Sequence, residues 1–223
     1  IIFSTPSHKT NVDYLENNFD LPCYKIGSDD ACNLPFIEYV AKIGKPILLS
    51  TGMCTMEEVE DAVNTIHNTG NNQLILMHCT SCYPTHPEDI NINAIRSMCK
   101  LFGLPIGYSD HTIGTLAAIS STVIGACVVE KHFILNHSDD KPDSVLSANY
   151  FEMKQLVDGI RFIEYAKGDG IKRPTKSERI NRLYNRKSIV AIQDILKNTI
   201  ITNDMIDIKR PGTGIEPKFL NIV

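Results

Sequence analysis

The stretches IGYSDHTIG (residues 106–114) and VVEKHFIL (residues 128–135) each place a histidine where a short apolar run ends. Both runs are bounded by Gly or Pro, and this pattern is typical of buried β-strands. His111 and His132 therefore fall at the carboxyl ends of two predicted strands. In α/β proteins the carboxyl ends of parallel strands carry the functional side chains, so these stretches indicate both the fold class and the site.

Strand-like and helix-like segments alternate along most of the chain. A helical pattern follows each of six apolar runs, at residues 1–5, 23–27, 46–50, 74–80, 105–109 and 126–132. The clearest helix begins at Thr55, where TMEE predicts a capping box closed by Glu58, and Gly70 predicts the end of the helix. Further helices are predicted over about residues 87–102 and 150–167. This alternation predicts an α/β fold with a parallel sheet.

Two α/β architectures fit the six βα units. The unit length suits a (β/α)8 TIM barrel, in which strand, helix and loops need about 30 residues, but a barrel needs eight units. The chain is then an open six-stranded sheet, or it is a barrel whose first two units precede Ile1. The start of the chain favours upstream units, because IIFSTP (residues 1–6) begins inside an apolar run. No G-x-G-x-x-G motif follows a strand, and this absence weakens a dinucleotide-binding open sheet.

Composition narrows the class of protein. The net charge of -4, with no basic stripe, argues against a nucleic-acid partner. No signal peptide and no apolar run of membrane-spanning length is found, so no membrane partner is expected. The cysteines number 7 and are scattered, which predicts reduced thiols and a cytoplasmic location. Cys79 and Cys82 form a lone C-x-x-C, for which core packing is favoured over a structural zinc site.

Polar side chains at the strand ends predict an anion pocket and a metal site. The anion pocket for a phosphate or carboxylate is predicted from one cation and five hydroxyl groups, Lys25, Thr5, Ser28, Ser50, Ser81 and Ser109. Period-two alternation places Ser109 and His111 on one side of their strand, and Glu130 and His132 on one side of the next. Two histidines on adjacent strands can share a divalent metal, and the alternative for each is a hydrogen-bonded packing role.

Several motifs, in order along the chain, resemble the sialic acid synthase family, the N-acetylneuraminate synthases and their legionaminate and pseudaminate relatives. The motifs are YKIGSDDACNLPFIEYVAKIGKPILLSTGM (residues 24–53), HCTSCYPTHPEDIN (78–91), GYSDHTIG (107–114), EKHFIL (130–135), PDSVLS (142–147) and IKRPGTGI (208–215). The resemblance implies a phosphoenolpyruvate-dependent (β/α)8 barrel followed by a small antifreeze-like (SAF) domain, in a domain-swapped homodimer. It implies an incomplete barrel over residues 1–167, a linker over 168–187 and a truncated antifreeze-like domain over 188–223.

The resemblance also implies roles for single residues. His111 and His132 would bind Mn²⁺ or Mg²⁺ and act in catalysis together with Lys25. Phosphoenolpyruvate would be surrounded by Thr5, Lys25, Ser28, Ser50, Ser81, Tyr83 and Ser109. The sugar would face Asp30, Tyr83 and Asp143, and Arg210 of the partner subunit would hold its far end. Without the resemblance, Lys25 could be a surface cation, Tyr83 a packed ring, Asp143 the start of a loop and Arg210 a solvated charge.

The implied function is a transferase that condenses phosphoenolpyruvate with an N-acyl-amino hexose to give a nine-carbon sugar acid and phosphate. N-acetylmannosamine is the default sugar. A diacetamido-trideoxyhexose is the alternative, because the chain reads PDS at residues 142–144 where many family members read PDH. A metal-dependent hydrolase and a non-catalytic binding barrel are more remote. The lack of an H-x-H pair argues against the hydrolase, and intact Lys25, His111 and His132 argue against a binding barrel.

Overall fold

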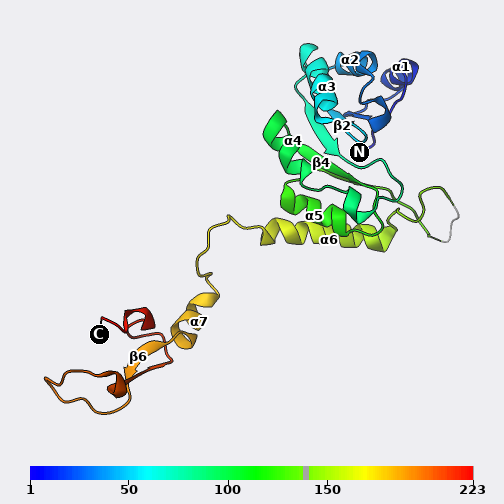
Figure 1. Ribbon diagram of the computed structural model, residues 1–223. Coiled ribbons are helices and arrows are strands. Elements are labelled where there is room, and N and C mark those ends of the chain that lie inside the picture. Colours follow the sequence, from blue (N-terminus) through cyan, green and yellow to red (C-terminus); the bar gives the residue numbers. More distant parts are fainter. Residues whose placement is uncertain (138–140, 223) are drawn as a thin grey trace. The chain divides into compact units, whose positions relative to one another are not determined.

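The computed structural model describes residues 1–137 and 141–222. The chain divides into two compact units, Ile1–Gly168 and Asp169–Val223, and each is described by itself. In Figure 1 the first unit runs from blue to yellow and contains the main sheet, and the second runs from yellow to red.

The first unit is built on a five-stranded parallel sheet in which the strand order follows the chain. The strands are β1 (Tyr24–Ile26), β2 (Ile47–Ser50), β3 (Leu74–His78), β4 (Ile106–Asp110) and β5 (Val129–Lys131). The predicted α/β fold with a parallel sheet is confirmed. The strand expected at residues 1–5 is wrong, because only Ser4 pairs there, in an isolated parallel bridge to Tyr24.

One helix precedes β1 and a helix follows each of the five strands, and together the helices form an arc around the sheet (Figure 1). They are α1 (Lys9–Asn18), α2 (Leu34–Ala41), α3 (Met56–Asn68), α4 (Ala94–Phe102), α5 (Leu116–Ile124) and α6 (Tyr150–Ala166), with short 3-10 turns η1 (Ser28–Asp30) and η2 (Pro87–Asp89). Right-handed crossovers between consecutive parallel strands place such helices on one side of the sheet. Among the described residues, no helix has both the length and the apolar character that a membrane span requires.

Side-chain alternation along the strands separates the core from the site. The side chains that pack with the helices form one buried apolar cluster, which includes Tyr24, Ile26, Ile47, Leu49, Leu74, Leu76, Ile106, Tyr108, Ile37, Val40, Ile66 and Ile95. Successive residues of a strand point to opposite faces, so Lys25, Ser50, Ser109 and Glu130 lie on the face away from the helices. The apolar face stabilises the sheet, and the polar face is left for the site.

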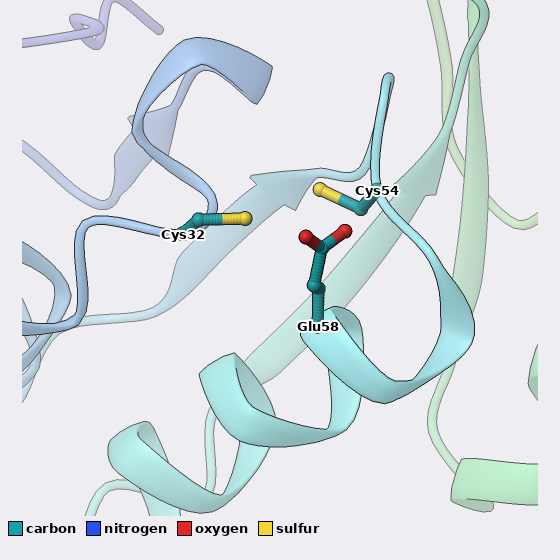
Figure 2. Close-up of side chains that lie close together, drawn as sticks. All are labelled: Cys32, Cys54 and Glu58. Carbon is teal, nitrogen blue, oxygen red and sulfur yellow. The ribbon is translucent and has the colours of Figure 1, made fainter.

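The predicted start of α3 is confirmed. The Thr55 hydroxyl accepts a hydrogen bond from the Glu58 amide at 3.3 Å, and the Glu58 carboxylate accepts one from the Thr55 amide at 2.7 Å. Figure 2 shows Glu58 on the first turn of this helix. Each bond satisfies an amide that a helix start otherwise leaves unpaired. Gly70 follows the helix with a φ of 86°, a left-handed conformation that glycine adopts without strain.

The second unit is a small antiparallel hairpin with short helical segments. Its elements are α7 (Glu178–Asn185), β6 (Ser188–Ala191), η3 (Asn203–Met205), β7 (Ile206–Lys209) and η4 (Pro217–Phe219). The buried Ser188 hydroxyl donates to the Pro211 carbonyl at 2.8 Å and accepts from the Gly214 amide at 2.9 Å, which fixes the turn after β7. The segment predicted as a linker, residues 168–187, contains α7.

Candidate functional site

Lys25, Ser109 and Glu130 form the centre of the polar face of the sheet. The Lys25 ammonium lies 2.9 Å from one carboxylate oxygen of Glu130 and donates to the other at 3.2 Å. The Ser109 hydroxyl donates to the same carboxylate at 3.2 Å. Lys25 is only 7% exposed, so a cation on an open strand face is held almost out of solvent. Burial of that kind requires a charged partner, and Glu130 supplies it.

The Lys25–Glu130 ion pair shows that the sheet is strongly curved. Lys25 belongs to β1 and Glu130 to β5, at opposite edges of the five-stranded sheet. In a flat sheet these strands would lie about 19 Å apart, because neighbouring strands are spaced by about 4.8 Å. Two extended side chains cannot span that gap. The sheet therefore curves like half of a barrel, with the polar residues on its concave face.

Glu130 is a site residue that the sequence prediction did not include. Its pairing with Lys25 joins residues 105 positions apart and depends on the curvature of the sheet. The available signal was the alternation that places Glu130 on the same side of its strand as His132. That signal gives the face of the sheet but not the partner.

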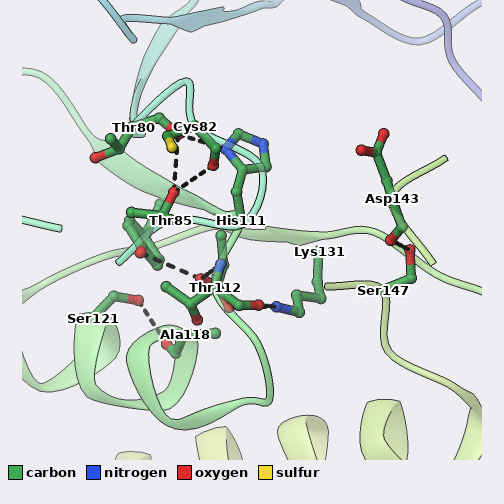
Figure 3. A network of polar contacts seen from close by, with 12 residues as sticks. Thr80, Cys82, Thr85, His111, Thr112, Ala118, Ser121, Lys131, Asp143 and Ser147 are labelled. Carbon is green, nitrogen blue, oxygen red and sulfur yellow. Dashed lines mark hydrogen bonds and ion pairs between the residues drawn. The ribbon is translucent and has the colours of Figure 1, made fainter. Parts of the chain in front are cut away.

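His111 is held in one orientation and one tautomer. It follows β4 directly, is 6% exposed, and its Nδ1 lies 2.8 Å from the Thr80 carbonyl oxygen (Figure 3). A carbonyl only accepts hydrogen bonds, so in the neutral ring Nδ1 carries the proton and Nε2 offers a lone pair. Burial lowers the pKa of His111 below its usual value, which favours this neutral form. A neutral imidazole with a free nitrogen is the form that binds a metal.

His132 and Tyr83 lie beside His111, and Asp143 lies near His132. The two imidazole rings lie 5.4 Å apart, centre to centre, and the Tyr83 ring lies 4.3 Å from that of His111. Nδ1 of His132 is 3.9 Å from a carboxylate oxygen of Asp143. Burial raises the pKa of the Tyr83 phenol, so it remains protonated near neutral pH. Two imidazoles at neighbouring strand ends are ligands that suit a divalent cation such as Mn²⁺.

A buried ion pair fixes the two strand ends that carry the histidines. Lys131 and Asp110 lie 2.9 Å apart, with side chains 1% and 0% exposed. Asp110 also accepts a hydrogen bond from the Thr112 amide at 3.0 Å, and Lys131 donates to the Thr112 carbonyl (Figure 3). By alternation this pair points to the face opposite that of His111 and His132. It therefore locks β4 to β5 from behind the site.

A small cradle of hydroxyl groups lies at Gly52, after β2. The Gly52 amide donates to the Ser28 hydroxyl at 3.0 Å, and the Cys79 sulfur lies 3.3 Å from the same oxygen. A Cβ atom at position 52 would lie 2.3 Å from the Ser81 hydroxyl oxygen and 2.9 Å from that of Ser28. Only glycine allows these loops to approach so closely. Ser28 and Ser81, predicted together for an anion pocket, therefore meet here.

The other predicted site residues take separate places. Thr5 is exposed and lies near Gly27, because a Cβ atom built at Gly27 would be 3.8 Å from the Thr5 methyl group. Ser50 is buried at the end of β2. Asp30 lies in η1 and accepts a hydrogen bond from the Asn33 side chain at 3.0 Å. Arg210 lies in the second unit, directly after β7.

The fold and the polar face together define a parallel α/β protein whose charged and hydroxylated side chains gather beyond the carboxyl ends of its strands. The NeuB family model matches residues 1–172. The chain belongs to the NeuB family, and the resemblance to sialic acid synthases inferred from its motifs is thereby confirmed.

Known relatives share most of the chain. An uncharacterized protein of Methanocaldococcus jannaschii is 45% identical over 100% of this chain and 66% of its own length. The N,N'-diacetyllegionaminic acid synthase of Campylobacter jejuni is 41% identical over 95% of this chain and 64% of its own. A solved N-acetylneuraminic acid synthetase from Leptospira borgpetersenii, in complex with citrate, aligns with a TM-score of 0.74 at 32% identity, over 79% of this chain and 61% of that one. The chain thus spans less than two thirds of each.

Proposed function

We propose that this chain belongs to a condensing synthase that joins phosphoenolpyruvate to an N-acyl-amino sugar and releases inorganic phosphate. The observation that carries the proposal is the concave face of the sheet, where the nearly buried cation Lys25 lies among hydroxyl groups on the same curved surface as His111 and His132. Membership of the NeuB family supports the same reaction.

Lys25 and the hydroxyl groups would bind phosphoenolpyruvate. An ammonium group and hydroxyls are suitable donors for the phosphate and carboxylate of this substrate. Ser109 already shares the Glu130 carboxylate with Lys25, and Ser28 and Ser81 meet at Gly52. Thr5, Ser50 and Tyr83 complete the proposed set. Fixing the substrate in one orientation supplies the proximity that a bond-forming step requires.

His111 and His132 would hold the divalent metal, with Mn²⁺ or Mg²⁺ as the candidates. Such an ion supplies Lewis-acid stabilisation for the sugar aldehyde oxygen, which gains negative charge when the methylene carbon of phosphoenolpyruvate attacks. The hydrogen bond from His111 to Thr80 holds the ring in place and keeps Nε2 free. Asp30, Tyr83 and Asp143 would face the sugar.

We also propose that residues 1–167 form an incomplete part of a (β/α)8 barrel, joined by a linker over residues 168–187 to a truncated antifreeze-like domain over residues 188–223. The Lys25–Glu130 pair supports a closed barrel because it requires half-barrel curvature. The greater length of the relatives also supports it. In a domain-swapped homodimer, Arg210 of the partner subunit would hold the far end of the sugar.

Two sugars are candidates. N-acetylmannosamine is the general substrate expected for sialic acid synthesis. A diacetamido-trideoxyhexose is favoured by the 41% identity to a legionaminic acid synthase and by Ser144 after Asp143. Each can be tested separately, because the reaction should proceed only with the sugar that fits.

Release of phosphate from phosphoenolpyruvate tests the proposal. The protein is given Mn²⁺ or Mg²⁺ and each sugar in turn, beside the variants His111→Ala and His67→Ala. We expect release that needs one sugar, is lost in His111→Ala and is kept in His67→Ala, because His67 lies in the last turn of α3. Phosphate release without any sugar would indicate a hydrolase instead, and no release from folded protein with metal bound would reject the synthase.

A further inference from the structure

A second group of potential metal ligands lies apart from the two histidines. Cys32 follows η1, Cys54 directly precedes the N-cap of α3, and Glu58 lies in the first turn of that helix. The two sulfur atoms and a carboxylate oxygen all lie within 4.8 Å of one another, and Figure 2 shows them pointing toward a common point. Cys32 and Glu58 are exposed and Cys54 is half-buried, so an ion could reach them from solvent.

The spacing is close to that of a tetrahedral site. With metal–sulfur bonds of about 2.3 Å, two thiolates on one zinc ion lie about 3.8 Å apart. Separations of at most 4.8 Å would therefore close by no more than about 1 Å on binding. Thiolate ligands favour soft or borderline cations such as Zn²⁺ over Mg²⁺ or Mn²⁺.

Glu58 is already oriented for this role by its helix cap. Its Oε2 atom accepts the hydrogen bond from the Thr55 amide at 2.7 Å, so Oε1 can face an ion. A hydrogen bond of this kind to a ligating group fixes its position and supports metal affinity. The capping box therefore both starts α3 and holds the Glu58 carboxylate in a position to bind an ion.

Electrostatics also favours a cation here. Deprotonating both thiols beside a carboxylate would place three negative charges together. A divalent cation offsets that repulsion and displaces the thiol protons when it binds.

We propose that Cys32, Cys54 and Glu58 bind a thiophilic divalent cation such as Zn²⁺, with water as the fourth ligand. The ion would clamp the loop after β1 to the loop after β2. These are the loops that carry Ser28 and Gly52, already joined by a 3.0 Å hydrogen bond. The site is independent of the proposed reaction, since none of its three ligands belongs to the predicted catalytic set.

Cobalt(II) titration of the reduced protein tests this site. Thiolate ligation of Co²⁺ produces charge-transfer absorption that histidine and carboxylate ligands do not, so His111 and His132 cannot mimic it. We expect the absorption in the wild type, its loss in Cys32→Ser and Cys54→Ser, and its displacement by Zn²⁺. Cys99→Ser and Cys82→Ser should leave it unchanged, because these exposed cysteines lie outside the group.

Glu58→Gln is the matched variant for the carboxylate. Glutamine can also close a capping box, so α3 should start normally while a charged ligand is lost. We expect metal affinity to fall by about 10-fold or more, since even supporting groups around a metal contribute about 10–100-fold. No thiolate absorption in the wild type, or the same absorption in Cys32→Ser, would overturn the proposal whatever the outcome of the phosphate-release assay.

Discussion

Lys25 is the residue on which the proposed anion pocket depends. It is held nearly out of solvent by Glu130, although the two residues belong to the opposite edge strands of the sheet. Exchanging Lys25 for methionine keeps a long side chain in place and removes only the charge and its hydrogen bonds. The concave face of the sheet would then lack its cation.

We expect Lys25→Met to raise the KM for phosphoenolpyruvate by about 10–100-fold, because hydrogen bonds to charged groups contribute about 1.5–3 kcal/mol. The measurement is initial rate against phosphoenolpyruvate concentration. Lys45→Met is the matched control, since Lys45 pairs with Glu16 and is not among the predicted site residues. An unchanged KM in Lys25→Met would remove this residue from the pocket.

His78 is expected to make the stability of the fold depend on pH. It ends β3, its Nε2 lies 2.8 Å from the Ile90 carbonyl oxygen, and burial lowers its pKa below 6.5. As pH falls below 6.5 the unfolded chain binds a proton that the folded imidazole resists. The free energy of unfolding should therefore decrease on acidification and be fully retained above that pH.

Urea denaturation on either side of about pH 6.5 measures this effect. We expect the decrease at low pH to be smaller in His78→Gln, in which the amide can still donate to the Ile90 carbonyl. His111 has a pKa lowered in the same direction, so some dependence will remain. Equal pH dependence in wild type and variant would show that His78 is not responsible.

At the scale of elements, the ends of β4 and β5 are joined by the buried Asp110–Lys131 pair. Removing one partner leaves an uncompensated charge in the interior. We expect Lys131→Met to lower the free energy of unfolding by about 3–5 kcal/mol, as in other broken buried pairs. Adding Asp110→Asn should restore part of that loss, because the unpaired carboxylate is then gone. A double variant less stable than Lys131→Met would contradict this explanation.

Local signals in the sequence predicted elements well where the physics is local. The capping box at Thr55 and the end of α3 near Gly70 depend on residues within a few positions of each other. The helix predicted from residue 87 begins later, at Ala94, because a 3-10 turn comes first and Asn91 has a left-handed φ of 44°. The helix α7 was missed because it is short and lies in a polar segment, where its few apolar residues, Ile180, Leu183 and Tyr184, give only a brief helical pattern.

Long-range relations were not available from the sequence. The positions of His111 and His132 at strand ends follow from short patterns, and so does the face of the sheet on which they lie. The contact between Lys25 and Glu130 does not follow from short patterns, because it depends on how strongly the five-stranded sheet curves. The same holds for Cys32 and Cys54, which come from different loops and meet only in the folded unit.

At the scale of the whole molecule, the curved sheet and the family membership both support the proposed condensation. The half-barrel curvature gathers groups from β1, β4 and β5 on one concave face. Such an arrangement can hold two reactants side by side, which is the requirement for forming a carbon–carbon bond. A hydrolase would need only one substrate and water.

The mass of the product is therefore the most direct test of the proposed synthase. Phosphoenolpyruvate, one candidate sugar and water should yield a single new acid plus inorganic phosphate, so the product mass equals the sum of the three reactants less phosphoric acid. We predict that mass spectrometry of the reaction with Mn²⁺ will detect this acid with N-acetylmannosamine or with the diacetamido-trideoxyhexose, and not with His111→Ala. Formation of pyruvate and phosphate with both sugars left unchanged would contradict the proposed condensation.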